Sequence, residues 1–176
     1  MAESFSNSLT RAAGIVTSTI SAATVGVGST VITGVSTAGV SIGDMVDTTH
    51  FRGGTKVVSI GSNEVSVDKT STNTASASSQ TVRFLGVATA FTASSKSILV
   101  GGTFANLTDN SINIFVEVGV GNTFVNIAND IPVPTGSSFV ISDAGKTVLR
   151  QNDLVRVYCD TADAVDINLS VLEGVA

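Results

Sequence analysis

The chain has 176 residues, enough for one large or two small domains, and 43% of them are hydrophobic, so a substantial core can be buried. Only 13% are charged, about half the share usual in a soluble domain. The formal net charge of -5 counts against nonspecific nucleic-acid binding, which needs clustered Lys and Arg. The remaining surface, rich in Ser, Thr, Asn and Gly, repels neighbours only weakly and favours assembly over a soluble monomer.

Residues 1–14 differ from the rest of the chain. Phe5, Leu9 and Ala12 or Ala13 fall at helical spacing, and Ser4 can serve as an N-cap. The segment is short for an isolated helix, so we expect either a short helix on its own domain or an arm that docks on a neighbour. We favour the arm.

The expected contact residues of this arm are Phe5, Leu9 and Arg11. Phe5 is the best anchor, because one aromatic side chain buried in a pocket can dominate an interface. The alternative is that Phe5 docks within its own domain.

Residues 15–86 contain short β-runs punctuated by Gly, Asn and Asp, which predict strands and tight turns. SNEV, at 62–65, is a hairpin candidate between VVSI and VSVD. We expect a small β-barrel or roll-like module here.

Residues 87–176 form a second series of β-runs with alternating apolar and polar residues, which predicts an antiparallel, jelly-roll-like β-sandwich. Pro132 and Pro134 must lie on an edge or at a strand entrance, because proline donates no ladder hydrogen bond. With helix nearly absent, the fold class is all-β: two small β-domains and a short N-terminal arm.

Two segments look loosely alike, RAAGIVTSTI at 11–20 and LGVATAFTAS at 85–94. Each places a Gly, a Val and a Thr-containing run in similar order. One interpretation is that the first module is an insertion, or a duplicated start, ahead of the second.

Catalytic patterns are not found. The single His50 lies in a Gly-rich turn, and the single Cys159 lies in a strand-like run where a core role is simplest. SDAGKT, at 142–147, ends like a phosphate-binding loop, but Val140 stands where that loop needs its first glycine, so a turn is expected. We expect no enzymatic activity and no cofactor.

Acidic residues are spread out, and the cluster of Asp160, Asp163 and Asp166 lacks the spacing of a calcium loop, so we expect solvated turn acids and no metal. Carbohydrate clefts usually supply aromatic platforms, and this chain has no Trp and one Tyr. No apolar run of about 18 residues exists, so no membrane contact is expected. The start of the chain lacks the apolar core of a signal peptide, which favours synthesis in a cytoplasm.

Four segments of the second domain carry a resemblance: ILVGGTFANLTDNSINIFVEV, IPVPTGSSFVI, KTVLRQNDLVRV and DAVDINLSVLE. With them, residues 87–173 resemble small virion structural proteins of marine tailed bacteriophages, particularly phages of cyanobacteria. The first domain is similar to β-modules that recur in virion proteins of such phages. The chain departs from the family in having about 70 residues ahead of the closing domain.

The resemblance implies a virion protein assembled in the host cytoplasm. We expect capsid decoration or cement, with homo-oligomers, preferably trimers, that bridge the major capsid protein. The alternatives are a neck, tail or fibre-associated virion protein, or a carbohydrate-binding module for host attachment.

Overall fold

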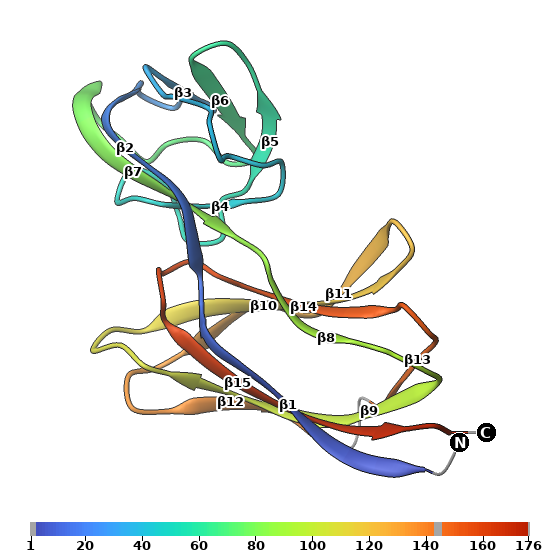
Figure 1. The fold of residues 1–176 in the computed structure, drawn as a ribbon. Helices are drawn as coiled ribbons and strands as arrows, with labels where there is room; N and C mark the ends of the chain where they lie inside the picture. Colours follow the sequence, from blue (N-terminus) through green and yellow to red (C-terminus); the bar gives the residue numbers. More distant parts are fainter. Residues whose placement is uncertain (1–2, 143–145, 176) are drawn as a thin grey trace. The chain divides into compact units, whose positions relative to one another are not determined.

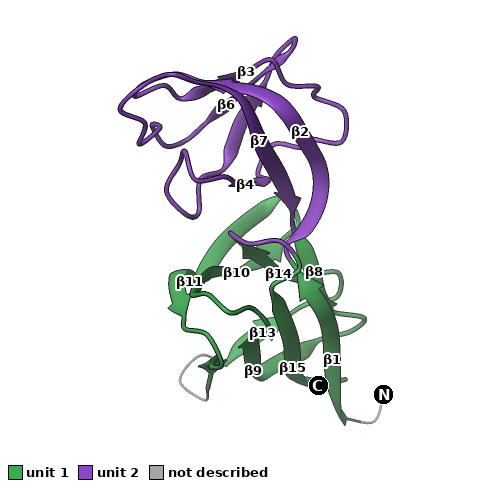
Figure 2. Cartoon of the chain, turned by 90° about the vertical axis from the view of Figure 1, so that its left-hand side faces the viewer, with its two compact units in different colours: residues 1–13, 88–159, 163–176 green, residues 14–87, 160–162 purple. Residues whose placement is uncertain are grey.

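The computed structural model describes residues 3–142 and 146–175. These residues form strands and turns without any helix, which confirms the all-β fold class. The chain divides into two compact units (Figure 2). We call residues 1–13, 88–159 and 163–176 the sandwich, and residues 14–87 with 160–162 the barrel. In sequence, the barrel is thus inserted between the first and second strands of the sandwich.

The sandwich strands lie in two antiparallel sheets (Figure 1). Their bounds are β1 Ser4–Ala13, β8 Ala88–Thr92, β9 Ser97–Asn106, β10 Ile112–Val120, β11 Thr123–Val133, β12 Ser138–Ile141, β13 Thr147–Leu149, β14 Leu154–Cys159 and β15 Val165–Glu173. One sheet has the order β1-β15-β9-β12, with β13 also paired to β9, and the other has the order β11-β10-β14-β8.

The pairing follows the order of the chain from both ends inwards. The first sandwich strand pairs with the last (β1 with β15), and the second pairs with the second-last (β8 with β14). Next, β9 pairs with β12 and β13, and β10 pairs with β11 in the middle. A long hairpin rolled into two sheets in this way is a jelly roll, so the expected jelly-roll-like sandwich has its full strand order.

Alternation along the strands builds the core of the sandwich. In β15, Val165, Ile167, Leu169 and Val171 are all buried, while the residues between them are more exposed. The buried side chains of both sheets, including Phe104, form one hydrophobic cluster. Each fully buried Leu, Ile, Val or Phe of this kind stabilises a fold by roughly 1.5–3 kcal/mol relative to an exposed one.

Pro132 lies in β11, the edge strand of the four-stranded sheet, and Pro134 follows that strand. The predicted edge position is therefore confirmed. An edge strand tolerates proline because one row of its backbone groups needs no ladder partner.

The N-terminal segment is neither a helix nor a free arm, and here the sequence interpretation is wrong. Residues 4–13 form β1, which pairs along its length with β15, from Ser4 opposite Glu173 to Ala13 opposite Val165. The spacing of Phe5 and Leu9 suits a strand as well as a helix, because four residues are a whole number of strand repeats.

The barrel strands are β2 Ile15–Val25, β3 Val31–Thr33, β4 Met45–Asp47, β5 Val57–Ile60, β6 Glu64–Val67 and β7 Ala77–Gly86. Their order is β4-β7-β2-β3-β6-β5. Backbone hydrogen bonds also join the two ends: Val57 N–H donates to Asp44 O at 2.9 Å, and Val46 N–H donates to Thr55 O at 2.9 Å. These bonds close the sheet on itself, which removes its free edges.

The interior of the barrel is filled by a second hydrophobic cluster that includes Phe84, Ile32 and Phe51. The predicted SNEV hairpin is confirmed as the connection between β5 and β6. Asn63 supplies its turn with a φ of 58°, a left-handed conformation that Asn tolerates better than most residues.

The sandwich should not fold normally without β1. A chain that begins at Gly14 loses the β1–β15 ladder, which should cost the sandwich on the order of 5 kcal/mol, comparable to the whole stability of a small domain. Tyr158, the only tyrosine, reports on the sandwich by fluorescence, and His50, the only histidine, reports on the barrel by NMR. We expect the Tyr158 transition to shift to lower denaturant while the His50 transition stays; an unchanged Tyr158 midpoint would contradict the structural role of β1.

Candidate interaction surface

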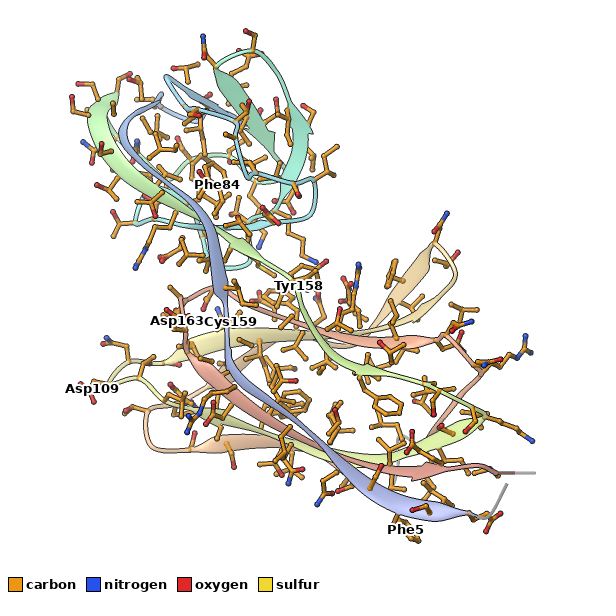
Figure 3. The ribbon with its side chains drawn as sticks, in the orientation of Figure 1. Phe5, Phe84, Asp109, Tyr158, Cys159 and Asp163 are labelled. Carbon is orange, nitrogen blue, oxygen red and sulfur yellow. The ribbon has the colours of Figure 1, made fainter. Side chains whose placement is uncertain are left out.

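The residues expected to form an interface lie on one face of β1. Phe5 is 74% exposed and Leu9 is 75% exposed, and Arg11 is exposed on the same alternation. The intervening side chains are more buried; among them, Ser8 Oγ donates to Ala90 O at 2.6 Å. Figure 3 shows Phe5 on β1, pointing away from the interior of the sandwich. The structure thus brings the three predicted residues together on one side, and their interface role stays a prediction.

Phe5 heads a row of apolar side chains that crosses the outer side of its sheet. The strand registers place Leu172 opposite Phe5, Ile98 opposite Leu172, and Val148 opposite Ile98. Val148 is 58% exposed, and Leu172 and Ile98 are partly exposed. We call these four residues the apolar row. Side chains directly opposite one another on neighbouring strands are in contact distance, so the row is one continuous surface feature.

A groove lies beside the apolar row on the same sheet. Its volume is about 520 Å3, and it is lined by Leu9, Thr10, Arg11, Thr103, Ala105, Asp166, Ile167 and Asn168. The groove crosses three strands, β1, β15 and β9. Its lining combines aliphatic and polar groups with one cation, Arg11, and one anion, Asp166, a mixture that suits contact with another protein surface better than the binding of a strongly charged ligand.

Two further outward residues of β1, Glu3 just before the strand and Asn7 at its centre, escaped the sequence interpretation. Neither Glu3 nor Arg11 makes an ion pair within the described residues. The signal that could have found them is the period-two alternation of Glu3, Phe5, Asn7, Leu9 and Arg11.

Two of the three acidic residues considered for calcium accept hydrogen bonds within the protein. Asp166 Oδ1 accepts a hydrogen bond from Ala12 N–H at 2.9 Å, and Asp160 Oδ1 accepts one from the Thr161 hydroxyl at 3.1 Å. Asp163 lies in a turn with a φ of 51°. Within residues 3–142 and 146–175, no group of three or more His, Cys, Asp or Glu side chains could hold a metal ion.

The residues considered for catalysis are held in structural roles. His50 bonds through its two ring nitrogens to Asn73 Oδ1 and Gln80 Oε1, each at 2.9 Å. Cys159 belongs to the sandwich core, which confirms the simple prediction for it. In SDAGKT, residues 143–145 lie outside the described residues.

An ion pair stacked on an aromatic ring braces the outer side of the four-stranded sheet. Arg156 Nη2 lies 2.8 Å from Glu117 Oε2, and Glu117 is buried. The guanidinium carbon of Arg156 lies 3.3 Å from the centre of the Phe124 ring. Phe124 can lie there because its cross-strand neighbour is Gly119, and a Cβ atom at that position would overlap the ring. A cation on a ring face adds roughly 0.5–2 kcal/mol.

In the barrel, Asp47 and Arg83 are opposite one another on β4 and β7 and form an ion pair of 2.6 Å. Burial raises the pKa of the Asp47 carboxyl above its ordinary value of 3.8, while the charge of Arg83 and its hydrogen bond act in the opposite direction. Burial dominates because the carboxylate loses more hydration free energy than it gains from its attraction to the partly exposed Arg83 guanidinium.

Comparison of the chain with protein-family models, with curated proteins and with solved structures gives no match in any of the three. No helix suited to crossing a membrane occurs in the part of the chain that the structure describes.

Breaking the Glu117–Arg156 pair should destabilise the sandwich. Arg156→Met leaves the Glu117 carboxylate buried beside an uncharged side chain, and we expect a loss of about 3 kcal/mol. Adding Glu117→Leu removes the buried negative charge and should recover much of that loss. Urea unfolding followed by Tyr158 fluorescence measures both variants; a double variant less stable than Arg156→Met alone would contradict the expected cause.

The stability of the barrel should fall with rising pH because of Asp47. A carboxyl whose folded pKa is raised contributes stability that is fully present below its ordinary value of 3.8 and is lost as the pH rises through the folded pKa. Asp47→Asn should flatten this decline at pH values above 3.8, whereas Glu64→Gln, a control at an exposed position of the hairpin, should not. Urea unfolding followed by the His50 NMR signal checks this, and equal slopes for Asp47→Asn and the unsubstituted chain would contradict it.

Proposed function

We propose that the chain is a non-enzymatic structural protein of a bacteriophage virion that decorates and cements the capsid by bridging major capsid subunits. The observation that carries the proposal is the apolar row on an open sheet face. The row crosses four strands and is exposed most at its two ends, Phe5 and Val148, and contiguous exposed apolar surface favours a protein partner.

The mechanism is interfacial. Burying Phe5 and Val148 against a capsid subunit removes apolar surface from water and stabilises the complex by roughly 1.5–3 kcal/mol per fully buried side chain. Modest affinity per copy suffices on a particle, because oligomers that engage several sites at once gain from high effective concentration. The low charge of the chain, 13% of residues, limits repulsion between densely packed neighbours.

The jelly roll supports the proposal as an analogy. Capsid proteins of viruses use this architecture, and so do lectins and several enzymes, so the fold alone fixes no function. The resemblance of residues 87–173 to virion proteins of marine phages points to the first of these uses. The alternatives, a neck or tail position and a carbohydrate-binding role, are distinguished by the experiments described next.

Copy number in purified virions tests the position. Quantitative mass spectrometry should find on the order of hundreds of copies per particle if the protein covers the capsid, because decoration repeats with the capsid lattice. A count of about six to twelve would place it in a neck or tail ring, and absence from the particle would overturn the virion role. Specific binding on a glycan array would support the carbohydrate alternative.

Substitution of the apolar row tests the contact itself. Phe5→Ser combined with Val148→Ser should lower the affinity for particles that lack the protein by about tenfold or more, because each substitution removes an apolar side chain that the contact would bury. Ile42→Ser is a matched control because Ile42 is 68% exposed and lies in the barrel. An equal loss from both variants, or none from the first, would contradict binding through the row.

A further inference from the structure

Between Ser4 and Thr10, the β1 strand is an open sheet edge without the usual protection, because its register shift and its charged residue, Arg11, both lie after Thr10. It ends the order of its sheet, and within the described residues no strand pairs with its other side. From Ser4 to Thr10 it pairs with β15 in unbroken register, and the sequence SFSNSLT contains no proline and no charge. Natural edges are commonly blunted by charges, prolines or bulges, because a regular free edge is a template for another strand.

The edges of the other sandwich sheet are protected. Edge strand β11 has Pro132, two register shifts against β10, and Asp130 at a φ of 55°. Edge strand β8 has only 5 residues and a register shift against β14. Edge strand β12, at the other end of the β1 sheet, has only 4 residues, so β1 offers the longest regular edge among the described sandwich strands.

The outward residues of β1 are self-complementary. Read forwards they are Glu3, Phe5, Asn7, Leu9 and Arg11. In an antiparallel pair of two such strands centred on Asn7, Glu3 meets Arg11 of the second copy, Phe5 meets Leu9, and Asn7 meets itself. The pairs join opposite charges, apolar groups and amides, in that order.

We propose that two copies of this chain dimerise through β1, edge to edge and antiparallel, with the two-fold axis at Asn7. The occupant of the edge is a second copy because the same sequence run backwards supplies an apolar partner for Phe5 and matching charges at both ends. Each unpaired Glu3 and Arg11 then gains a partner, twice per dimer. The Oδ1 atom of Asn7 already accepts a hydrogen bond from the Ser170 hydroxyl at 3.2 Å, which leaves the side-chain NH2 of Asn7 to donate to the second copy.

The backbone permits this register whether the N–H and C=O groups of Asn7 point to β15 or to the free edge. In an antiparallel ladder, hydrogen-bonded and non-hydrogen-bonded pairs alternate, and a two-fold axis can pass through either kind. The contact is isologous and closes after two copies, so it predicts a dimer in place of the trimer expected from the sequence. It does not depend on a virion role.

Cross-linking tests the register. With Asn7 on the axis, the Cα atoms of an Asn7→Cys pair would be about 4.5–5.5 Å apart, within the range of a disulfide. We expect Asn7→Cys to form a covalent dimer under mild oxidation. Phe5→Cys should not cross-link with itself, because its two copies lie about 14 Å apart, but it should cross-link with Leu9→Cys when the two variants are mixed.

The matched control is Val125→Cys, which is 59% exposed on the protected edge strand β11. The native Cys159 is buried in the core and should not contribute. A yield from Val125→Cys equal to that from Asn7→Cys, or self-cross-linking of Phe5→Cys equal to its cross-linking with Leu9→Cys, would overturn the proposed register.

A charge exchange tests the specificity of the contact. Glu3→Arg or Arg11→Glu alone places like charges opposite one another twice per dimer, and each should raise the dimer Kd about tenfold or more at low ionic strength. Mixing the two single variants restores opposite charges at both ends, so they should form a heterodimer. The double variant Glu3→Arg with Arg11→Glu should also recover.

Sedimentation equilibrium of the full chain gives the assembly state for each variant, and Tyr158 fluorescence checks that the sandwich is folded. A monomer at all concentrations, a trimer, or single variants that dimerise as well as the unsubstituted chain would overturn the proposal. Failure of this test leaves the copy-number result for the virion untouched, so the two proposals fail separately.

Discussion

The ladder between β1 and β15 is the interaction on which the sandwich depends. It joins the first strand of the jelly roll to the last, across more than 150 residues of intervening sequence, and without it the rolled hairpin has no closure. Two bonds fix where it ends: Ala164 N–H donates to Ala13 O at 2.9 Å, and Asp166 Oδ1 accepts Ala12 N–H. After β1 the chain forms the barrel and then re-enters the sandwich at β8, while the β1–β15 ladder keeps the first and last strands of the sandwich together.

The same ladder determines which groups of β1 reach the surface. Because β15 occupies one side of the strand, all remaining backbone bonding capacity faces the other side, and the alternation turns Phe5 and Leu9 outwards. A flexible arm could present the same side chains only after paying the entropy of ordering its backbone. As part of a sheet, these outward side chains are held on an ordered backbone before any partner binds.

Much of the fold was predictable, because it depends on local signals. The period-two alternation, the SNEV turn and the prolines of IPVP each act within a few residues, and each led to a correct prediction. The N-terminus was mispredicted because its partner, β15, lies at the far end of the chain, and Phe5 and Leu9 fit both periods. Nor could the Gly119–Phe124–Arg156 stack be expected, since it needs the register of three strands.

The edge and the face of β1 offer two contacts that do not compete. Pairing through the edge uses backbone groups, while the apolar row presents side chains perpendicular to the sheet, so a dimer would keep its rows uncovered. It would also bring Phe5 beside Leu9 of the second copy and present two rows on one continuous sheet. Two linked rows bind a repeating surface more tightly than one, because the second engages at high effective concentration. Under the proposed capsid-decorating function, self-association through β1 would therefore strengthen a contact that is weak for one copy.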